Sequence, residues 1–268
     1  MNIVIQNFLS LNKNLRFVTI PQHILLITAL TLMVTGVFSF WWLLVMYLGW
    51  FFIGFIGFNI FYHRYHSHKS FKTYRSIEIL GTYLGLLSGR GSPLYMVNTH
   101  VPLHHAYSDT ELDPHTPLKG FWFAYILWQN DGVKLNIGVV RSLLRDSVMK
   151  YMSDNYYKIF WLTFFILCLL SVPFAIFFMI GAGVLQTHSE GIIATFGHSN
   201  GRWGSKDHPT GDNSCNLRGP FNWITLGSAL HNNHHLRPGS YTYIIDHRDI
   251  DVAKYVIKFI SKSGTLKL

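Results

Sequence analysis

Two long stretches of this sequence, residues 17–63 and residues 159–189, contain no charged side chain. A helix needs about 20 apolar residues to cross the hydrocarbon core of a bilayer, so the first stretch is too long for one span and too apolar for a soluble element. Charged residues make up only 13% of the chain, against about a quarter in soluble domains. These features favour a membrane-embedded protein.

We expect four transmembrane helices in two hairpins, which turn near Ser39 and near Pro173. Their expected bounds are 22–37, 41–62, 154–171 and 174–197. Neither turn carries Lys or Arg, so the positive charge lies on the opposite side, which the positive-inside rule assigns to the cytoplasm. Segments 63–153 and 198–268 would then form a cytoplasmic helical cap, with both termini on that side. The sequence predicts an all-α integral membrane protein with one domain over residues 1–268.

The formal net charge is +9, which could indicate a nucleic-acid partner. The basic residues lie outside the apolar runs, however, as a membrane surface would require. We therefore expect the lipid bilayer as a partner and no nucleic acid. Within the cap, the apolar stretches 79–87 and 121–128 are too short to span and are expected to be interfacial or core helices.

Fifteen histidines occur in the chain, and most of them fall near the ends of the expected spans. His63, His66 and His68 follow the second span, and His198 ends the fourth. The other clustered histidines are His100, His104 and His105 in HVPLHH, His115 in DPH, and His231, His234 and His235 in HNNHH. Several imidazoles at one depth predict a metal site, and their number suggests two ions.

Spacing indicates how these imidazoles would meet. In HNNHH, positions i, i+3 and i+4 share one helix face, so these three imidazoles can converge on one volume. His63 and His68 are five residues apart, about 140° around an α-helix, so they could approach a site from different sides. Imidazole suits iron, copper and zinc alike, so spacing alone does not select the metal. Oxygen-bearing side chains that could orient the ligands are Asp109, Glu111, Asp113, Asp207, Asp212, Asn216 and Asn232.

Four segments resemble the histidine-bearing motifs of the membrane fatty acyl desaturases of the acyl-CoA type. Three of them resemble the family's histidine boxes: HRYHSHKSFK, the run from SPLYMVNTHVPLHH to SDTELDPHTPLKGFW, and ALHNNHHLRPGS. The fourth, GHSNGRWG, resembles the stretch that carries a single histidine, here His198. The resemblance covers roughly residues 55–240. It implies a cap that holds a di-metal site. The implied metal ligands are His63, His68, His100, His104, His105, His198, His231, His234 and His235.

The sequence departs from the family pattern at two places. Three residues, 101–103, separate His100 from His104 where the family has two, so we expect a local bulge at Pro102 to restore the register of His100. Ala194 stands where the family commonly has Asn, and Thr195 or Asn200 would have to replace its polar contact. The histidines expected not to bind metal are His66 (supporting or surface), His115 (organising its loop), His188, His208 and His247.

The resemblance implies two iron ions, dioxygen as co-substrate, and insertion of a cis double bond into a saturated acyl chain on CoA or another carrier. It implies no catalytic residue beyond the metal ligands and a small cytochrome or ferredoxin as electron donor. Three alternatives stay open: a related hydroxylase, ketolase or alkane oxygenase, a histidine-lined metal transporter, and a haem-binding electron carrier. Glu190 lies within the fourth expected span, where an ionisable group faces the bundle interior or a wet cavity unless it sits near the interface.

Overall fold

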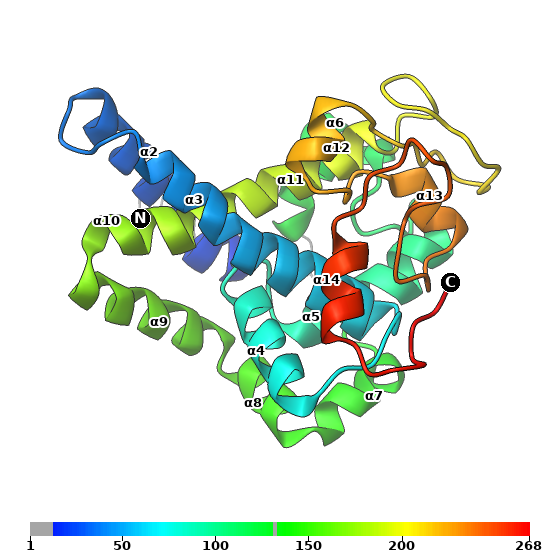
Figure 1. The fold of residues 1–268 in the computed structure, drawn as a ribbon, viewed down its shortest axis with the longest axis horizontal. Helices are drawn as coiled ribbons and strands as arrows, with labels where there is room; N and C mark the ends of the chain where they lie inside the picture. Colours follow the sequence, from blue (N-terminus) through cyan, green and yellow to red (C-terminus); the bar gives the residue numbers. More distant parts are fainter. Residues whose placement is uncertain (1–12, 131–132) are drawn as a thin grey trace, which may run out of the picture.

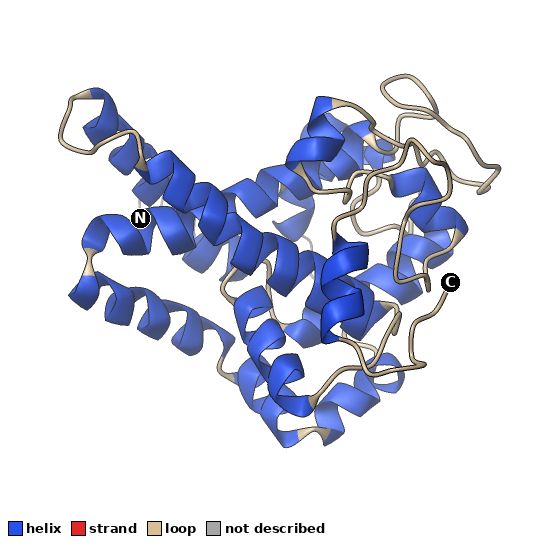
Figure 2. Ribbon diagram, viewed as in Figure 1, coloured by secondary structure: helices blue, strands red, loops and turns tan. Residues whose placement is uncertain are grey.

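The computed structural model describes residues 13–130 and 133–268, and every regular element in this part is a helix (Figures 1 and 2). Within these residues, three helices are long and apolar enough to cross a membrane: Leu15–Val34, Trp42–Ser67 and Val172–Phe196. Each one combines α-helix with π-helix. They consist of η1 (Leu15–Thr19) with α2 (Ile20–Val34), α3 (Trp42–Trp50) with η2 (Phe51–Ser67), and α10 (Val172–Phe174) with η6 (Ala175–Gly181) and α11 (Ala182–Phe196).

The expected third span corresponds to α9 (Tyr156–Leu170), an apolar helix of 15 residues. At 1.5 Å per residue it is about 22 Å long, shorter than a hydrocarbon core of about 30 Å. It ends because Ser171 is extended and its hydroxyl accepts a hydrogen bond from the Phe174 amide at 3.3 Å, which starts the next helix. The first span begins at Leu15, earlier than expected, since Pro21 lies inside a continuing helix rather than at its start. Residues 1–12, and with them the expected position of the N-terminus, lie outside the described residues.

The shorter helices lie between and after the long ones. They are α4 (Arg75–Leu86), α5 (Pro93–Thr99), η3 (His100–His105), η4 (Pro117–Lys119), α6 (Phe121–Tyr125), η5 (Leu127–Asn130), α7 (Ile137–Arg145), α8 (Ser147–Asp154), α12 (Pro220–Ile224), α13 (His231–Leu236) and α14 (Ala253–Ile260). The apolar stretches 79–87 and 121–128 are helical, as predicted. Helix α4 packs tightly on η2, because Gly57 and Gly85 let the two backbones meet without room for a side chain.

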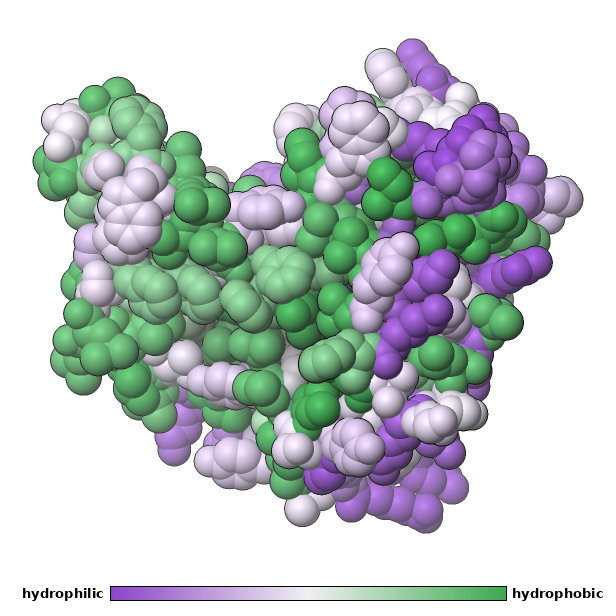
Figure 3. Space-filling view, in the orientation of Figure 1, coloured by the Kyte–Doolittle hydropathy of each residue, from purple (hydrophilic) through white to green (hydrophobic). Residues whose placement is uncertain are grey.

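Hydrophobic and hydrophilic side chains gather at opposite ends of the molecule. Figure 3 shows a largely hydrophobic surface over α2, α3, α9 and α10, and hydrophilic side chains at the end that carries α13. Val34, Leu169 and Leu170 are 80%, 87% and 78% exposed, which a water-facing surface would disfavour. Such a surface suits lipid, and it places the histidine-rich segments away from the apolar end.

Candidate metal centre

The first pair of histidines lies at the end of η2, where the backbone is π-helical. The His68 amide donates to the His63 carbonyl at 3.1 Å, the i→i+5 pattern of a π-helix. The two Nε2 atoms are therefore 3.3 Å apart. The two imidazoles meet at one site with their ring planes 81° apart, across a π-helical turn that the spacing alone did not predict.

The second pair, His100 and His105, spans the π-helical segment η3. Their Nε2 atoms are 3.1 Å apart, so the five-residue spacing again brings two imidazoles together. The predicted bulge at Pro102 takes the form of this π-helix, which accommodates the extra residue of the second box. The segment thereby repeats the geometry of His63 and His68.

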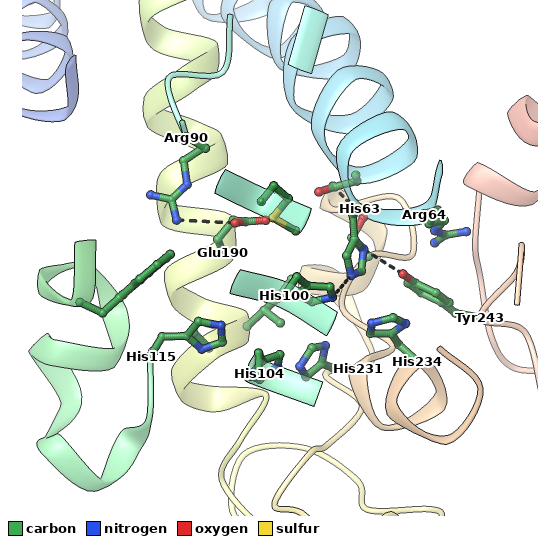
Figure 4. A pocket seen from close by; sticks show the side chains of 16 residues that line it. His63, Arg64, Arg90, His100, His104, His115, Glu190, His231, His234 and Tyr243 are labelled. Atoms are coloured by element: carbon green, nitrogen blue, oxygen red, sulfur yellow. Dashed lines mark hydrogen bonds and ion pairs between the residues drawn. The ribbon is translucent and has the colours of Figure 1, made fainter. Parts of the chain in front are cut away.

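All nine histidines of the predicted set gather in two groups, in each of which one nitrogen per residue lies within 4.8 Å of the others. The first group is His63, His68, His100, His105 and His234. The second is His104, His198, His231 and His235. Figure 4 shows imidazoles of both groups facing a common cavity. HNNHH does form a helix, but its imidazoles do not all converge on one volume. His234 belongs to the first group, and His231 and His235 belong to the second.

Three carboxylates hold imidazoles of the second group in orientation. Asp113 lies 3.1 Å from Nδ1 of His104, Asp109 lies 3.1 Å from Nδ1 of His198, and Asp212 lies 2.6 Å from Nδ1 of His235. An imidazole that donates from Nδ1 presents the lone pair of Nε2 to a metal. These three members of the predicted orienting set are therefore placed as expected. The other four, Glu111, Asp207, Asn216 and Asn232, make no hydrogen bond to the nine histidines within the described part of the chain.

Tyr243 orients the first group, and no spacing pattern pointed to it. Nδ1–H of His63 faces the Tyr243 hydroxyl at 3.1 Å. The Arg64 guanidinium lies 3.6 Å from the Tyr243 ring centre and pairs with Asp251 at 2.9 Å. Tyr243 is thus fixed from one side by a buried ion pair and fixes an imidazole on the other.

Replacing Tyr243 with Phe is expected to weaken metal binding by about 10–100-fold, the usual cost of losing a partner that orients a ligating histidine. The ring and its packing would remain, so the effect should appear in metal affinity more than in stability. Competition with a chelator, followed by metal analysis, measures it. Tyr255→Phe on α14, where the side chain is 66% exposed, is the control. Equal metal retention in the two variants would contradict the assigned role.

The imidazoles are suited to bind a cation because they are uncharged. Burial holds the pKa of His68, His100 and His105 well below the ordinary value of 6.5, and the repulsion that a protonated imidazole would meet from its neighbours lowers the pKa further. The same causes act on the pKa values of His104, His231 and His234. Neutral imidazoles are the form that binds metal.

The donor set also fits metal ions in its geometry. Nε2 of His235 is buried and has no hydrogen-bond partner among the described residues, although its Nδ1 is held by Asp212. Nε2 of His198 and Nε2 of His231 are 2.8 Å apart. Metal–nitrogen bonds of about 2.1 Å place adjacent ligand atoms about 3 Å apart. The second group therefore has the convergence that a bound ion requires.

The histidines predicted not to ligate lie outside the two groups. His66 is buried, and its Nε2 lies 2.7 Å from the Thr82 hydroxyl, so it supports the fold and is not a surface residue. His115 lies beside His104, with ring centres 4.1 Å apart and ring planes tilted by 39°, and these two histidines form a further group of close potential ligands with Asp113. His188 lies 3.3 Å from His23 between their Nε2 atoms, and its Nδ1 lies 3.0 Å from the Tyr125 hydroxyl.

The remaining expectations concern residues of α11 and of the loop that follows it. Ala194 lines the cavity. The Thr195 hydroxyl donates to the Gly191 carbonyl at 2.7 Å, and Asn200 accepts from Lys206 at 3.1 Å, so neither replaces the polar group that Ala194 lacks. Glu190 also lines the cavity, which confirms that it faces the interior.

Comparison with known proteins agrees with this geometry. A sequence model described as fatty acid desaturase matches residues 39–247, a range that contains all nine histidines. The chain belongs to the fatty acid desaturase family. Together with its three long apolar helices, this makes the chain a membrane protein.

Curated members of the fatty acid desaturase family differ in the acyl carrier that their names give. The chain is 32% identical to an acyl-CoA C20 Δ5-desaturase of Anemone leveillei, over 70% of this chain and 61% of that protein. It is 31% identical to Δ9 acyl-lipid desaturase 2 of Arabidopsis thaliana, over 70% of this chain and 62% of that protein. The chain therefore spans about three-fifths of the length of these relatives.

Proposed function

We propose that this chain is a dioxygen-dependent fatty acyl desaturase that inserts a cis double bond into a saturated acyl chain. The observation that carries the proposal is the pair of adjacent histidine groups that open on one cavity, in a chain of the fatty acid desaturase family. Two iron ions are the proposed metals, held by the nine histidines. Zinc fits the ligands but has no redox chemistry, and an unactivated methylene offers side chains no acidic proton to remove.

When bound, the two irons supply the redox chemistry by which dioxygen, two electrons, two protons and two substrate hydrogens yield two waters and the alkene. The protein's own part is to hold the imidazoles neutral and oriented and to position the chain. Met96, Trp128 and Ile193 line the cavity beside the imidazoles and would hold the reacting carbons. Positioning of this kind supplies regiochemistry, since only carbons held near the reactive centre react.

We infer a topology of four spans, with α9 as the third and with the cap and both termini on the cytoplasmic side of one domain. The exposed apolar side chains of α9 support this, since Leu162, Phe165 and Leu169 would lie in water if the helix did not meet lipid. A small cytochrome or ferredoxin is the proposed electron donor. Acyl-CoA is the proposed substrate form, although relatives named for acyl-CoA and for acyl-lipid are equally similar.

The test is lipid analysis of cells that express the chain or its His234→Ala variant, with iron measured on both purified proteins. We expect a new monounsaturated acyl product that His234→Ala abolishes, together with loss of the iron that the first histidine group would hold. His247→Ala is the matched control, because its side chain is 88% exposed and lies in neither group. A hydroxylated or carbonyl product without a new double bond would contradict the desaturase and indicate a related hydroxylase or ketolase. Metal flux without reductant or dioxygen would indicate a transporter.

A further inference from the structure

An ion pair lies in the wall of the cavity that the histidines share. Arg90 projects from a turn between α4 and α5, where Gly89 and Gly91 have φ of +77° and +98°. Glu190 comes from α11, and Figure 4 shows the two side chains facing each other, with Glu190 nearer to the imidazoles than Arg90 is. Arg90 also lines a second cavity, together with Trp128, so it lies in the wall that the two cavities share.

The contact between these charges is loose. Nη2 of Arg90 lies 3.6 Å from Oε2 of Glu190, and the Arg90 side chain is 4% exposed. That distance is longer than a hydrogen bond. Nε and Nη1 of Arg90 have no partner among the described residues. Arg64, in the same cavity, makes two bonds of 2.9 Å to Asp251 and leaves only its Nε without a partner among the described residues. Arg90 is left with donors to offer.

Glu190 belongs to a polar chain that leads away from Arg90. Its Oε1 accepts from the Gln186 amide at 3.0 Å, and Gln186 also donates to Asn59 at 3.0 Å. Asn59 in turn donates to the Ser228 hydroxyl at 2.9 Å. These contacts fix the carboxylate from behind and leave the guanidinium as the side chain with unmet hydrogen-bonding capacity.

A plain hydrocarbon chain in this cavity would leave the Arg90 donors buried and unpaired, which is unfavourable. A carboxylate would satisfy them but would meet the charge of Glu190. A neutral oxygen acceptor satisfies the guanidinium without that repulsion. The chemistry of the wall thus selects a carbonyl or hydroxyl oxygen.

We propose that the substrate carries a neutral oxygen acceptor that binds Arg90 inside the cavity, beside the carbons that react. The inference rests on the proposed function, because it names the class of acyl substrate. The acceptor has two possible sources: the carbonyl of the acyl ester, thioester or amide itself, or an oxygen substituent further along the chain. The first source places the reaction near the carbonyl end, and the second requires a functionalised chain.

The experiment measures binding of defined probes to the iron-loaded full chain in detergent, from the probe-dependent rise in unfolding temperature. The probes are hexadecane, methyl hexadecanoate, and methyl oxohexadecanoates with the ketone at successive positions. Wild type is compared with Arg90→Gln and with Arg141→Gln, a control at an exposed position of α7. The double variant Arg90→Met/Glu190→Met removes both charges, a change that buried ion pairs often tolerate.

We expect wild type and Arg141→Gln to bind an oxygenated probe at least about tenfold more tightly than hexadecane, as a charge-assisted hydrogen bond allows. Arg90→Gln and the double variant should lose that preference. A preference for methyl hexadecanoate alone would identify the acyl carbonyl, and one confined to oxo probes would identify a substituent. The proposal fails if wild type has no preference or if the variants keep it. Should Arg90→Gln not fold, the double variant decides.

Failure of this inference is separable from failure of the proposed function. Binding is read without turnover, so an enzyme that makes an alkene but shows no Arg90-dependent preference would overturn only the substrate class. Conversely, a chain that shows the Arg90-dependent preference but forms no alkene would support oxygen binding by Arg90 and contradict the proposed desaturase activity.

Discussion

Alanine at His104 is expected to empty one proposed iron position and alanine at His105 the other, although the two residues are neighbours. His104 belongs to the second histidine group and His105 to the first, because η3 turns their imidazoles in different directions. Each variant should retain about one iron per chain instead of two, since a lost ligand weakens its own ion most. Both should lose the alkene product entirely, because the proposed reaction needs both ions.

Double variants show which position is empty. His104→Ala/His231→Ala removes two ligands of the second group and should retain about as much iron as His104→Ala alone, since the losses fall on one ion. His104→Ala/His105→Ala should retain almost none. Metal analysis by mass spectrometry on the purified proteins gives the answer, with His247→Ala as the control. Equal iron in the two double variants would disprove the division into two positions.

Asp251→Ala is expected to destabilise the fold by about 3–5 kcal/mol, the usual cost of removing one partner of a buried ion pair. The side chains of Arg64 and Asp251 are 1% and 0% exposed. Asp251 also accepts from the Tyr243 amide at 2.8 Å, so its loss strands a buried guanidinium and frees the segment that holds Tyr243. Thermal or denaturant unfolding in detergent measures the change.

The matched control for that prediction is Asp154→Ala on α8. Asp154 pairs with Lys150, but the two side chains are 53% and 51% exposed, and exposed pairs contribute little. We expect its unfolding temperature to stay close to that of the wild type. Similar losses of stability in the two variants would show that burial does not increase the contribution of the Arg64–Asp251 pair to stability. Iron content of Asp251→Ala should fall as well, because Tyr243 orients His63.

Much of the fold was predictable because a helix that crosses lipid needs about 20 apolar residues, and such a run is visible in the local composition. The charge-free stretches identify the long helices, and the short apolar stretches 79–87 and 121–128 identify helices of the histidine-bearing segment. The residues at which helices begin and end were harder to predict from the sequence. Leu15 starts a helix that runs through Pro21, since a π-helical segment precedes it, and sequence patterns based on α-helical rotation do not register such segments.

The candidate site was predictable in membership but not in arrangement. Histidine spacing and the family resemblance together named the nine residues, whereas the π-helical turns decide which imidazole meets which. Tyr243 and His63 are 180 positions apart, so no local pattern pairs them. Arg90 stands between two glycines in an ordinary-looking turn, and only the folded chain shows that its guanidinium enters the cavity.

Neighbouring residues on α13, His234 and His235, reach different histidine groups, as His104 and His105 do on η3. Each of these two short helices would therefore hold ligands for both positions, so that the two positions are coupled through a helix and not through loops that adjust independently. Filling one position would immobilise both short helices and pre-arrange the ligands of the other. Metal uptake by the intact centre should therefore be cooperative at limiting iron, and a variant that lacks one position should hold its single ion more weakly than the wild type holds either ion.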